Sequence, residues 1–284
     1  MSDRDDAEVI RDVGALGDTS ADPDRRETAA EQIFQDGTLV LIGCGAAKRD
    51  PEDPTDVNLA EVGPDEKLAP NWSDEKGPAW RAEDLYTSTY FGVKRELAET
   101  VTQWDGDPDT TPWAILSAEH DLLWPWEVVK PYDKTIGDLG DDPTVEEDRV
   151  HNALGLRRPD GQEIVSEMDQ WATMVAYGLS RWLSMHREKK AMPYTSEAST
   201  LLVLAGQDYI EPLRERGVFE FGASRMMGDV NDAYELPVDV RSLFEEIDAG
   251  GIGEQMGWMS EAIEALGGPA DRSEQATLAG GEQA

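Results

Sequence analysis

A thiol and an amine stand four residues apart in a glycine-rich turn of this 284-residue chain. The turn, GCGAAK at residues 43–48, follows an apolar run typical of a buried strand, and its Cys44 is the only cysteine of the chain. Gly43 and Gly45 permit unusual backbone angles and the close approach of a ligand. Backbone N–H groups in such a turn can hold an anion or a carbonyl group. The turn is therefore a candidate site, although a tight turn around a buried thiol would have the same sequence.

Cys44 and Lys48 have distinct candidate catalytic roles in that turn. A cysteine in its thiolate form is a nucleophile. Lys48 could hold a phosphate or a carbonyl group, or act as an amine nucleophile if desolvation lowers its pKa. The spacing excludes two common phosphate-binding loops, because GxxxxGK(S/T) is absent and the third residue after Gly45 is a lysine, not a glycine.

One cysteine and three histidines limit the metal chemistry of the chain. A single cysteine excludes an internal disulfide bond and a zinc site built from several thiolates. The three histidines are scattered, with neither HxxxH nor His/Cys spacing, so the sequence predicts no histidine-built metal site. Metal binding through carboxylates stays open, and the sequence indicates no particular cofactor.

Polar side chains follow a second apolar run, WAILSA at residues 113–118. Ser117 and His120 come at the end of that run, and Tyr132 and Asp133 follow a proline soon afterwards. His120 and Asp133 are a candidate acid–base pair, and Ser117 and Tyr132 are candidate substrate-binding residues. A histidine in so acidic a chain can equally be a solvated surface group.

Three further positions are candidates for ligand binding. Tyr86 and Ser88 precede a predicted helix, whose N-terminal hydroxyl and N–H groups suit an anion, while a plain helix cap is the alternative. Gly206 ends a third apolar run and opens another predicted helix, so it is also a candidate substrate-binding residue. Trp124 and Trp126 flank a proline, and they either pack in the core or offer a flat surface for a base.

Apolar periodicity predicts the elements that must position these residues. Continuous apolar runs predict buried strands at 38–42, 113–118 and 200–206, with VFEF at 218–221 as a candidate fourth strand. Residues 93, 97, 101 and 104 lie on one face of a helix that Ser88 or Thr87 would cap. Further helices are predicted over 164–182, 208–216 and 252–266.

The alternation of strands and helices predicts an α/β fold. We expect a single Rossmann-like domain over 37–267, with a mainly parallel sheet and helices on both faces. Acidic stretches near 50–80 and 136–162 are predicted surface loops, residues 1–36 a flexible acidic leader, and residues 268–284 a disordered tail. Ligands of such sheets bind at the carboxyl ends of the strands, which is where the candidate residues fall.

The formal net charge of −35 is spread along the chain, and does not come from one acidic tail. This composition favours a protein of a halophilic archaeon, which keeps molar salt in its cytoplasm. A mimic of nucleic acid or a binder of basic proteins is the alternative. The first residues do not resemble a signal peptide, and no apolar run is long enough to span a bilayer, so we expect a cytoplasmic protein without a membrane partner.

The order of the short motifs resembles that of a family of microbial and phage proteins known as a domain of unknown function, the DUF6884 type. The motifs are Gly-Cys-x-x-x-Lys from residue 43, Asp-Leu-Tyr-x-Ser-x-x-Phe from 84, Leu-Ser-Ala-x-His-x-Leu from 116, Pro-Tyr-Asp-x-Thr from 131, Leu-Ala-Gly-x-x-Tyr from 204 and Gly-Ile-Gly-Glu-Gln-x-x-Trp from 251. Together they span roughly residues 38–266, with gaps at the two acidic stretches. The resemblance implies that one pocket holds Cys44, Lys48, Tyr86, Ser117, His120, Tyr132 and Asp133.

Two better-known families share parts of this pattern. The DUF6884 type is distantly similar to the peroxide-stress protein YaaA, which is associated with DNA. Its Cys-x-x-x-Lys motif is similar to that of archaeosine synthase, which modifies a deazaguanine base in tRNA. The archaeosine signature continues Lys-Pro-Tyr, whereas Lys48 is followed here by Arg49-Asp50, and Asp121 stands where the resemblance predicts glycine.

Two functions from different classes follow from the sequence. The first is an enzyme that acts on a nucleobase, a nucleotide or a nucleic acid through a pocket at the strand ends. The second is a non-catalytic protein of stress protection that binds a nucleotide or nucleic acid, with Trp124 and Trp126 as stacking residues. The sequence leaves the substrate and the oligomeric state open.

Overall fold

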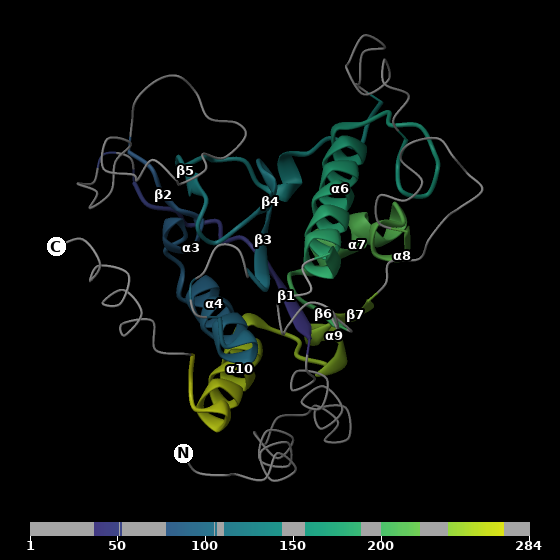
Figure 1. The fold of residues 1–284 in the computed structure, drawn as a ribbon. Coiled ribbons are helices and arrows are strands. Elements are labelled where there is room, and N and C mark those ends of the chain that lie inside the picture. The colour runs from purple at the N-terminus through teal and green to yellow at the C-terminus, as the bar shows by residue number, and fades with distance from the viewer. Residues whose placement is uncertain are drawn as a thin grey trace, which may run out of the picture.

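A computed structural model describes residues 37–50, 52, 78–104, 106, 111–143, 157–188, 200–221 and 238–269 (Figure 1). The leader predicted at 1–36, most of the acidic stretch at 50–80 and all but two residues of the tail predicted at 268–284 lie outside these residues. The strands are β1 (Thr38–Gly43), β2 (Trp80–Arg81), β3 (Trp113–Ser117), β4 (Asp121–Leu123), β5 (Val128–Val129), β6 (Thr200–Leu204) and β7 (Asp239–Ser242). The helices are α3 (Ala82–Leu85), α4 (Thr89–Thr102), η2 (Ile136–Asp138), α6 (Glu167–Glu188), α7 (Gln207–Glu215), α8 (Val218–Phe221), α9 (Leu243–Glu246) and α10 (Ile252–Leu266).

The described residues form a mixed α/β fold around a five-stranded sheet of order β4-β3-β1-β6-β7. β1 pairs in parallel with β3 and β6, β6 pairs in parallel with β7, and β4 returns antiparallel to β3 at one edge. β2 and β5 form a separate antiparallel pair. The carboxyl ends of β1, β3 and β6 therefore meet at one edge of the sheet, as the sequence predicts.

β1 is a continuous apolar run because both of its faces are covered. Val40 and Ile42 belong to one hydrophobic cluster, and Leu39 and Leu41 belong to another. A strand buried on both faces has no need of polar positions, which explains why its sequence does not alternate. The prediction of buried strands at 38–42, 113–118 and 200–206 is confirmed.

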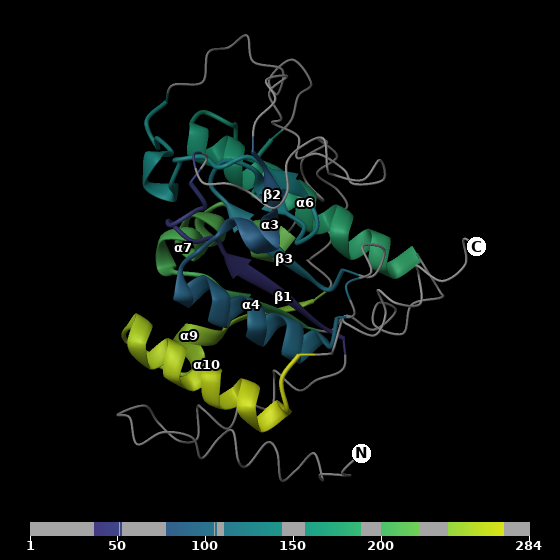
Figure 2. The same cartoon turned by 90° about the vertical axis from the view of Figure 1, so that its left-hand side faces the viewer.

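Helices cover both faces of the sheet (Figure 2). α4, α9 and α10 pack on the face of Val40 and Ile42, and α6 and α7 pack on the face of Leu39 and Leu41. Ser88 caps α4, because its Oγ accepts a hydrogen bond from the N–H of Phe91. The helices predicted at 164–182, 208–216 and 252–266 correspond to α6, α7 and α10.

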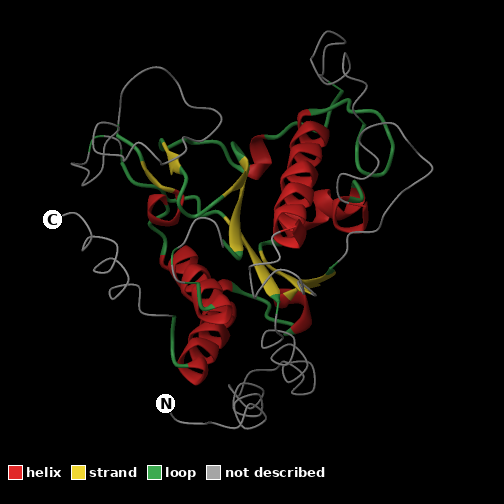
Figure 3. Cartoon of the chain, viewed as in Figure 1, coloured by secondary structure: helices red, strands yellow, loops and turns green. Residues whose placement is uncertain are grey.

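The prediction of a strand at VFEF is wrong, because residues 218–221 form helix α8 (Figure 3). A segment of four residues, three of them apolar, is too short to show a period, so its composition does not distinguish a strand from a helical turn. Gly217, with a φ of 70°, reverses the chain after α7, and Val218 is then buried in the cluster that also contains α6. The fourth parallel strand is instead β7, whose sequence DVRS is too polar to be recognised as a buried strand.

No helix within the described ranges is long and apolar enough to cross a membrane.

Candidate functional site at the strand ends

The carboxyl ends of β1, β3 and β6 bring Cys44, Ser117 and Tyr209 into one polar cluster. Cys44 follows β1 directly, and its N–H donates to the carbonyl of Leu116 on β3 at 2.9 Å. Its Sγ lies 3.0 Å from the hydroxyl oxygen of Tyr209, which stands in the first turn of α7 after β6. The thiol is half-buried, so it is partly accessible from outside.

Three hydroxyl groups form a chain beside the thiol. The oxygen of Tyr132 lies 2.8 Å from Ser117 Oγ and 2.7 Å from the oxygen of Tyr86. Ser117 Oγ already accepts hydrogen bonds from the N–H groups of Glu119 and His120. Because both of its lone pairs are used, Ser117 must donate its own proton to Tyr132. The serine thus fixes the direction of the chain, and the proton of Tyr132 is directed away from Ser117.

Burial keeps the phenols of this cluster protonated. Desolvation raises the pKa of Tyr86, Tyr132 and Tyr209 well above the usual value for tyrosine, and negative charge on Cys44 raises it further. A phenol that stays protonated is a hydrogen-bond donor. A thiolate at Cys44 would therefore face donors and not competing anions.

Lys48 reaches the same cluster by strand-like pairing with residue 86. An isolated antiparallel bridge joins Lys48 to Tyr86, and the N–H of Thr87 donates to the carbonyl of Ala47. Lys48 Nζ lies 4.1 Å from the ring centroid of Tyr132 and donates to the carbonyl of Ala46 at 3.4 Å. Burial lowers the pKa of Lys48, and the charges of Cys44 and Asp133 oppose that effect.

His120 lies beside the hydroxyl chain, whereas Asp133 lies at its rim. The ring of His120 meets that of Tyr132 edge-on, with centroids 5.0 Å apart. Within the described part of the chain, Nδ1 of His120 is buried and has no hydrogen-bond partner. Burial, with a smaller effect of Lys48, lowers the pKa of His120 to about 4, so the imidazole is neutral at pH 7. Asp133 is exposed, and it acts on Lys48 through its charge.

The glycines that the sequence singles out allow close packing at the strand ends. A Cβ on Gly43 would come within 3.1 Å of Ala205 Cβ, and one on Gly45 would come within 3.1 Å of Ser88 Oγ. Ser88 therefore serves as a helix cap and lies against the turn of Cys44. Gly206 is the N-cap of α7, where the carboxylate of Asp208 occupies the space of a Cβ at 2.5 Å.

The sequence analysis missed Lys94, the most deeply buried amine of the cluster. Its side chain is 3% exposed, its Nζ donates to the carbonyl of Gly43 at 2.6 Å, and it lies 4.6 Å from the ring centroid of Tyr90. Burial lowers the pKa of Lys94 to about 8, against the opposing charges of Cys44 and Asp208. A signal was present, because residue 94 falls between the buried Phe91 and Leu97 on the inner face of α4.

We call the set of these side chains the strand-end cluster; it consists of Cys44, Lys48, Tyr86, Lys94, Ser117, His120, Tyr132 and Tyr209. Its groups can act as a nucleophile, as cations and as neutral hydrogen-bond donors. Among the described residues, no group of three or more His, Cys, Asp or Glu side chains is arranged to hold a metal ion.

The two tryptophans proposed as a stacking surface lie against the core. Trp126 is 9% exposed, and its Nε1 donates to Thr111 Oγ1 at 2.9 Å. Trp124 is half-buried and packs edge-on against Trp182, with ring centroids 5.5 Å apart. Of the two alternatives that the sequence left open, core packing and base stacking, the position of both rings agrees with core packing.

The backbone conformation at Asp121 explains why the resemblance predicts glycine at this position. Its φ is 59°, in the left-handed region that glycine adopts most readily and aspartate tolerates. The resemblance predicts glycine there, and the backbone has the conformation that a glycine would favour.

Comparison with known proteins finds similarity to one family, whose function is not established. Residues 73–221 match the model of a family described as a family of unknown function, DUF6884. The matched region contains Tyr86, Lys94, Ser117, Tyr132 and Tyr209, but the turn with Cys44 and Lys48 precedes it and α10 follows it. No curated protein and no solved structure matches the chain.

Proposed function

We propose that this chain, which belongs to the DUF6884 family of unknown function, is an enzyme that acts on a nucleobase, a nucleotide or a nucleic acid, with Cys44 as its nucleophile. The observation that carries the proposal is the surroundings of the thiol. Cys44 Sγ lies 3.0 Å from the hydroxyl of Tyr209, and its charge is felt by the buried amines of Lys48 and Lys94. A half-buried thiol between a phenol donor and two cations is arranged for covalent catalysis.

The proposed step is addition of the Cys44 thiolate to an electrophilic carbon of the substrate. A carbon–sulfur bond forms, and the electron pair of the attacked C=N or C=O bond moves to the nitrogen or oxygen. The Lys48 ammonium, which is half-buried and nearer the outside than Lys94, donates a proton to that atom. Before attack the Tyr209 hydroxyl donates a hydrogen bond to the sulfur, and that bond weakens as the sulfur becomes neutral.

Neutral His120 replaces the acid–base pair that the sequence suggested. With a pKa of about 4, His120 is a proton acceptor or a neutral hydrogen-bond partner at pH 7. Its buried Nδ1, which has no hydrogen-bond partner among the described residues, is a candidate contact for a polar group of the substrate. Asp133 acts indirectly, because its negative charge favours the protonated form of Lys48.

The substrate class and the finer fold assignment rest on the resemblance to base-modifying and DNA-associated proteins. The position of the cluster supports both, because a Rossmann-like domain with helices on both faces of one sheet binds its ligands at the strand ends. Tyrosine rings beside the thiol can contact a planar base. The alternative, binding without catalysis through Trp124 and Trp126, loses its main support because those rings pack against Thr111 and Trp182.

Nucleoside analysis tests this function. DNA and tRNA would be isolated from a strain that lacks the gene and from the same strain carrying wild-type, Cys44→Ala or Asp239→Asn protein. Asp239 is an exposed residue of β7, so its variant controls for expression of a changed chain. The digested nucleosides would then be compared by mass spectrometry.

We expect a modified nucleoside that depends on wild-type protein and on the Asp239→Asn protein but not on the Cys44→Ala protein. Identical nucleoside profiles in all strains would remove nucleic acid as the substrate. A modification that survives in the Cys44→Ala strain would refute the role of the thiol, and circular dichroism of the purified variant would show that a loss of modification is not a loss of folding.

A further inference from the structure

We infer that Lys94 is a positioning residue of the strand-end cluster, whose buried ammonium group lies at the turn of Cys44 and stabilises the negative charge that the sulfur carries when it reacts. The inference rests on the proposed role of Cys44 as nucleophile and extends it. Lys94 lies on the inner face of α4, within the region that matches the family model. The thiol on which it would act lies outside that region.

The contacts of Lys94 place its charge next to the turn of Cys44. Nζ donates to the carbonyl of Gly43, the residue before Cys44, at 2.6 Å. A Cβ built on Gly43 would lie 3.7 Å from the same nitrogen. The ammonium is thus at the end of β1, and the charged groups that act on it are Cys44 from the β1 turn and Asp208 from α7.

The position of Lys94 has no structural ion pair to explain it. Among the described residues, no carboxylate lies within ion-pair distance of its Nζ, and its hydrogen-bond acceptor is a neutral carbonyl. A buried charge without a close counter-ion opposes folding. Lys94 also stands between buried Phe91 and Leu97, where an apolar side chain would pack without that penalty. A charge kept at such a place is the pattern expected of a functional group.

Tyr90 and α10 fix the orientation of Lys94. The hydroxyl of Tyr90 donates to Gln255 Oε1, and Gln255 Nε2 donates to the carbonyl of Ala249 at 3.2 Å. Gln255 is thereby held at both ends of its amide, and it in turn holds the Tyr90 ring 4.6 Å from Lys94 Nζ. Gln255 therefore links the last helix of the described chain to the thiol at the first strand.

Alkylation of the single cysteine tests the inference without any knowledge of the substrate. The rate of reaction of the full chain with iodoacetamide would be measured from pH 6 to pH 9, and the modified residue would be identified as Cys44, the single thiol of the chain, by peptide mass spectrometry. The charged groups around the sulfur are Lys48 and Lys94, and the titratable phenols are Tyr86, Tyr132 and Tyr209. The variants are Lys94→Met, which keeps the side-chain volume and removes the charge, and Arg157→Met, a control that removes an exposed cation.

We expect the Lys94→Met protein to react about tenfold more slowly at pH 7, because it loses a buried unit charge at the residue that precedes Cys44. Its thermal midpoint should be unchanged or higher. The Arg157→Met protein should react at the wild-type rate. An unchanged rate in the Lys94→Met protein would overturn the inference, and so would a large loss of stability, since Lys94 would then be structural.

Gln255→Leu provides a second variant that leaves Lys94 in place. It removes the acceptor of the Tyr90 hydroxyl, and we expect a rate reduced about threefold, a smaller effect because the charge itself remains. A wild-type rate in this protein would refute the positioning of Lys94 by α10. None of these results depends on nucleoside analysis, so the role of Lys94 and the proposed substrate class can fail separately.

Discussion

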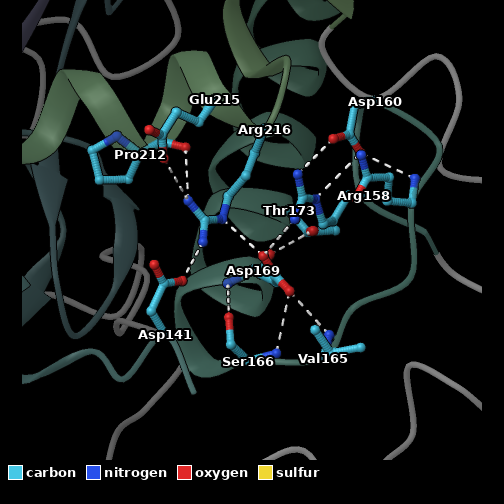
Figure 4. Close-up of polar contacts among 11 residues, drawn as sticks. Asp141, Arg158, Asp160, Val165, Ser166, Asp169, Thr173, Pro212, Glu215 and Arg216 are labelled. Atoms are coloured by element: carbon cyan, nitrogen blue, oxygen red, sulfur yellow. Dashed lines mark hydrogen bonds and ion pairs between the residues drawn. The ribbon is translucent and has the colours of Figure 1, made fainter. Parts of the chain in front are cut away.

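Two polar clusters of the described residues, each with a buried centre, differ in how completely their charges are paired. The first, which we call the Asp169 network, consists of Asp141, Arg158, Asp160, Asp169 and Arg216 (Figure 4). Asp169 accepts from Arg216 Nε at 2.8 Å, from Arg158 at 3.0 Å and from the N–H of Val165 at 3.0 Å. Each charge of this network faces an opposite charge.

The Asp169 network also completes the N-terminus of α6. Ser166 Oγ accepts from the N–H of Asp169 at 3.0 Å, and Asp169 accepts from the N–H of Ser166 at 3.2 Å, which is a capping box. Burial alone would raise the pKa of Asp169, but the backbone hydrogen bonds and the two arginines outweigh it, so that pKa is lowered. The network therefore ties the start of α6 to the end of α7 by Arg216.

The strand-end cluster is arranged in the opposite way. Its Lys94 faces a neutral carbonyl, and the buried Nδ1 of His120 lacks a partner among the described residues. The pKa of Lys94 is shifted toward pH 7, whereas the pKa of Asp169 is shifted further below pH 7. Removal of one partner from a buried ion pair is strongly destabilising, whereas incompletely paired buried charges are common at ligand-binding sites. We therefore expect a structural role for the Asp169 network, and the functional role proposed for the strand-end cluster agrees with its incomplete pairing.

Asp169→Ala should have the largest effect on stability. It would leave Arg158 and Arg216 without their shared carboxylate and remove one of the two hydrogen bonds of the capping box of α6, so we expect a loss of about 3–5 kcal/mol in the free energy of unfolding. The measurement is urea unfolding in molar KCl, which screens the net charge of −35.

Asp239→Ala is the matched control for that change. Asp239 pairs with Arg241 at 3.2 Å on the surface, and such pairs contribute about 0–1 kcal/mol. If the two alanine variants unfold at the same urea concentration, the Asp169 network is not the structural anchor that the comparison requires.

Lys94→Met should change stability in the other direction. The pKa of Lys94 falls from its ordinary 10.5 to about 8 in the folded protein, so folding at pH 7 is opposed by the buried charge. We expect the variant to be more stable by roughly 2 kcal/mol at pH 7, after the lost hydrogen bond to Gly43 is allowed for. Wild-type stability should rise between pH 8 and pH 10.5, because the unfolded chain then binds more protons, and the advantage of the variant should shrink.

Urea unfolding of both proteins at pH 7 and pH 10 checks this prediction. A constant difference between them would show that the charge of Lys94 does not oppose folding.

The sequence predicts the buried elements well because they follow a hydrophobic period. β1, β3 and β6 are unbroken apolar runs, and Ser88 is recognisable as a cap. β4 and β7 are short edge strands with polar residues, and nothing local distinguishes them from loops. VFEF is predicted as a strand because it is mostly apolar, but its apolar residues belong to a helical turn that packs against α6 and α7.

The sequence groups polar residues that follow a strand, but it does not single out those that lie within a helix. Cys44 and Ser117 stand at strand ends and so could be grouped from topology alone. Tyr209 belongs to one of the motifs quoted from the sequence, but its contact with Cys44 arises only from tertiary packing and could not be predicted. Lys94 was missed because a lysine on a helix is normally read as a solvated residue. Its neighbours Phe91 and Leu97 mark the position as internal.

Asp121→Asn tests whether a second charge near the cluster also opposes folding. Burial raises the pKa of Asp121 to about 7, with Lys134 opposing and Glu119 adding to the shift. The folded protein therefore favours the protonated carboxyl, and stability is lost as the pH rises from about 4 through 7. Asparagine keeps the left-handed backbone and removes the charge.

We expect the Asp121→Asn protein to match the wild type at pH 4 and to be more stable by about 1.5 kcal/mol at pH 8, less than the full pKa shift would give, because the polar asparagine amide is buried in the same place. Thermal unfolding at both pH values provides the measurement. Equal stability at pH 8 would mean that the Asp121 carboxylate is satisfied in the fold, as Asp169 is.

Tyr132→Phe gives the smallest expected change in stability and the sharpest test of the comparison. It removes the hydroxyl between Ser117 and Tyr86, but Ser117 keeps the N–H groups of Glu119 and His120, and the ring remains. We expect a loss of about 1 kcal/mol, against a few tenths for the exposed control Tyr177→Phe. A loss as large as that of Asp169→Ala would make the hydroxyl chain a structural network of the same kind. The two clusters would then no longer differ in role, and the assignment of function to the strand ends would rest on Cys44 alone.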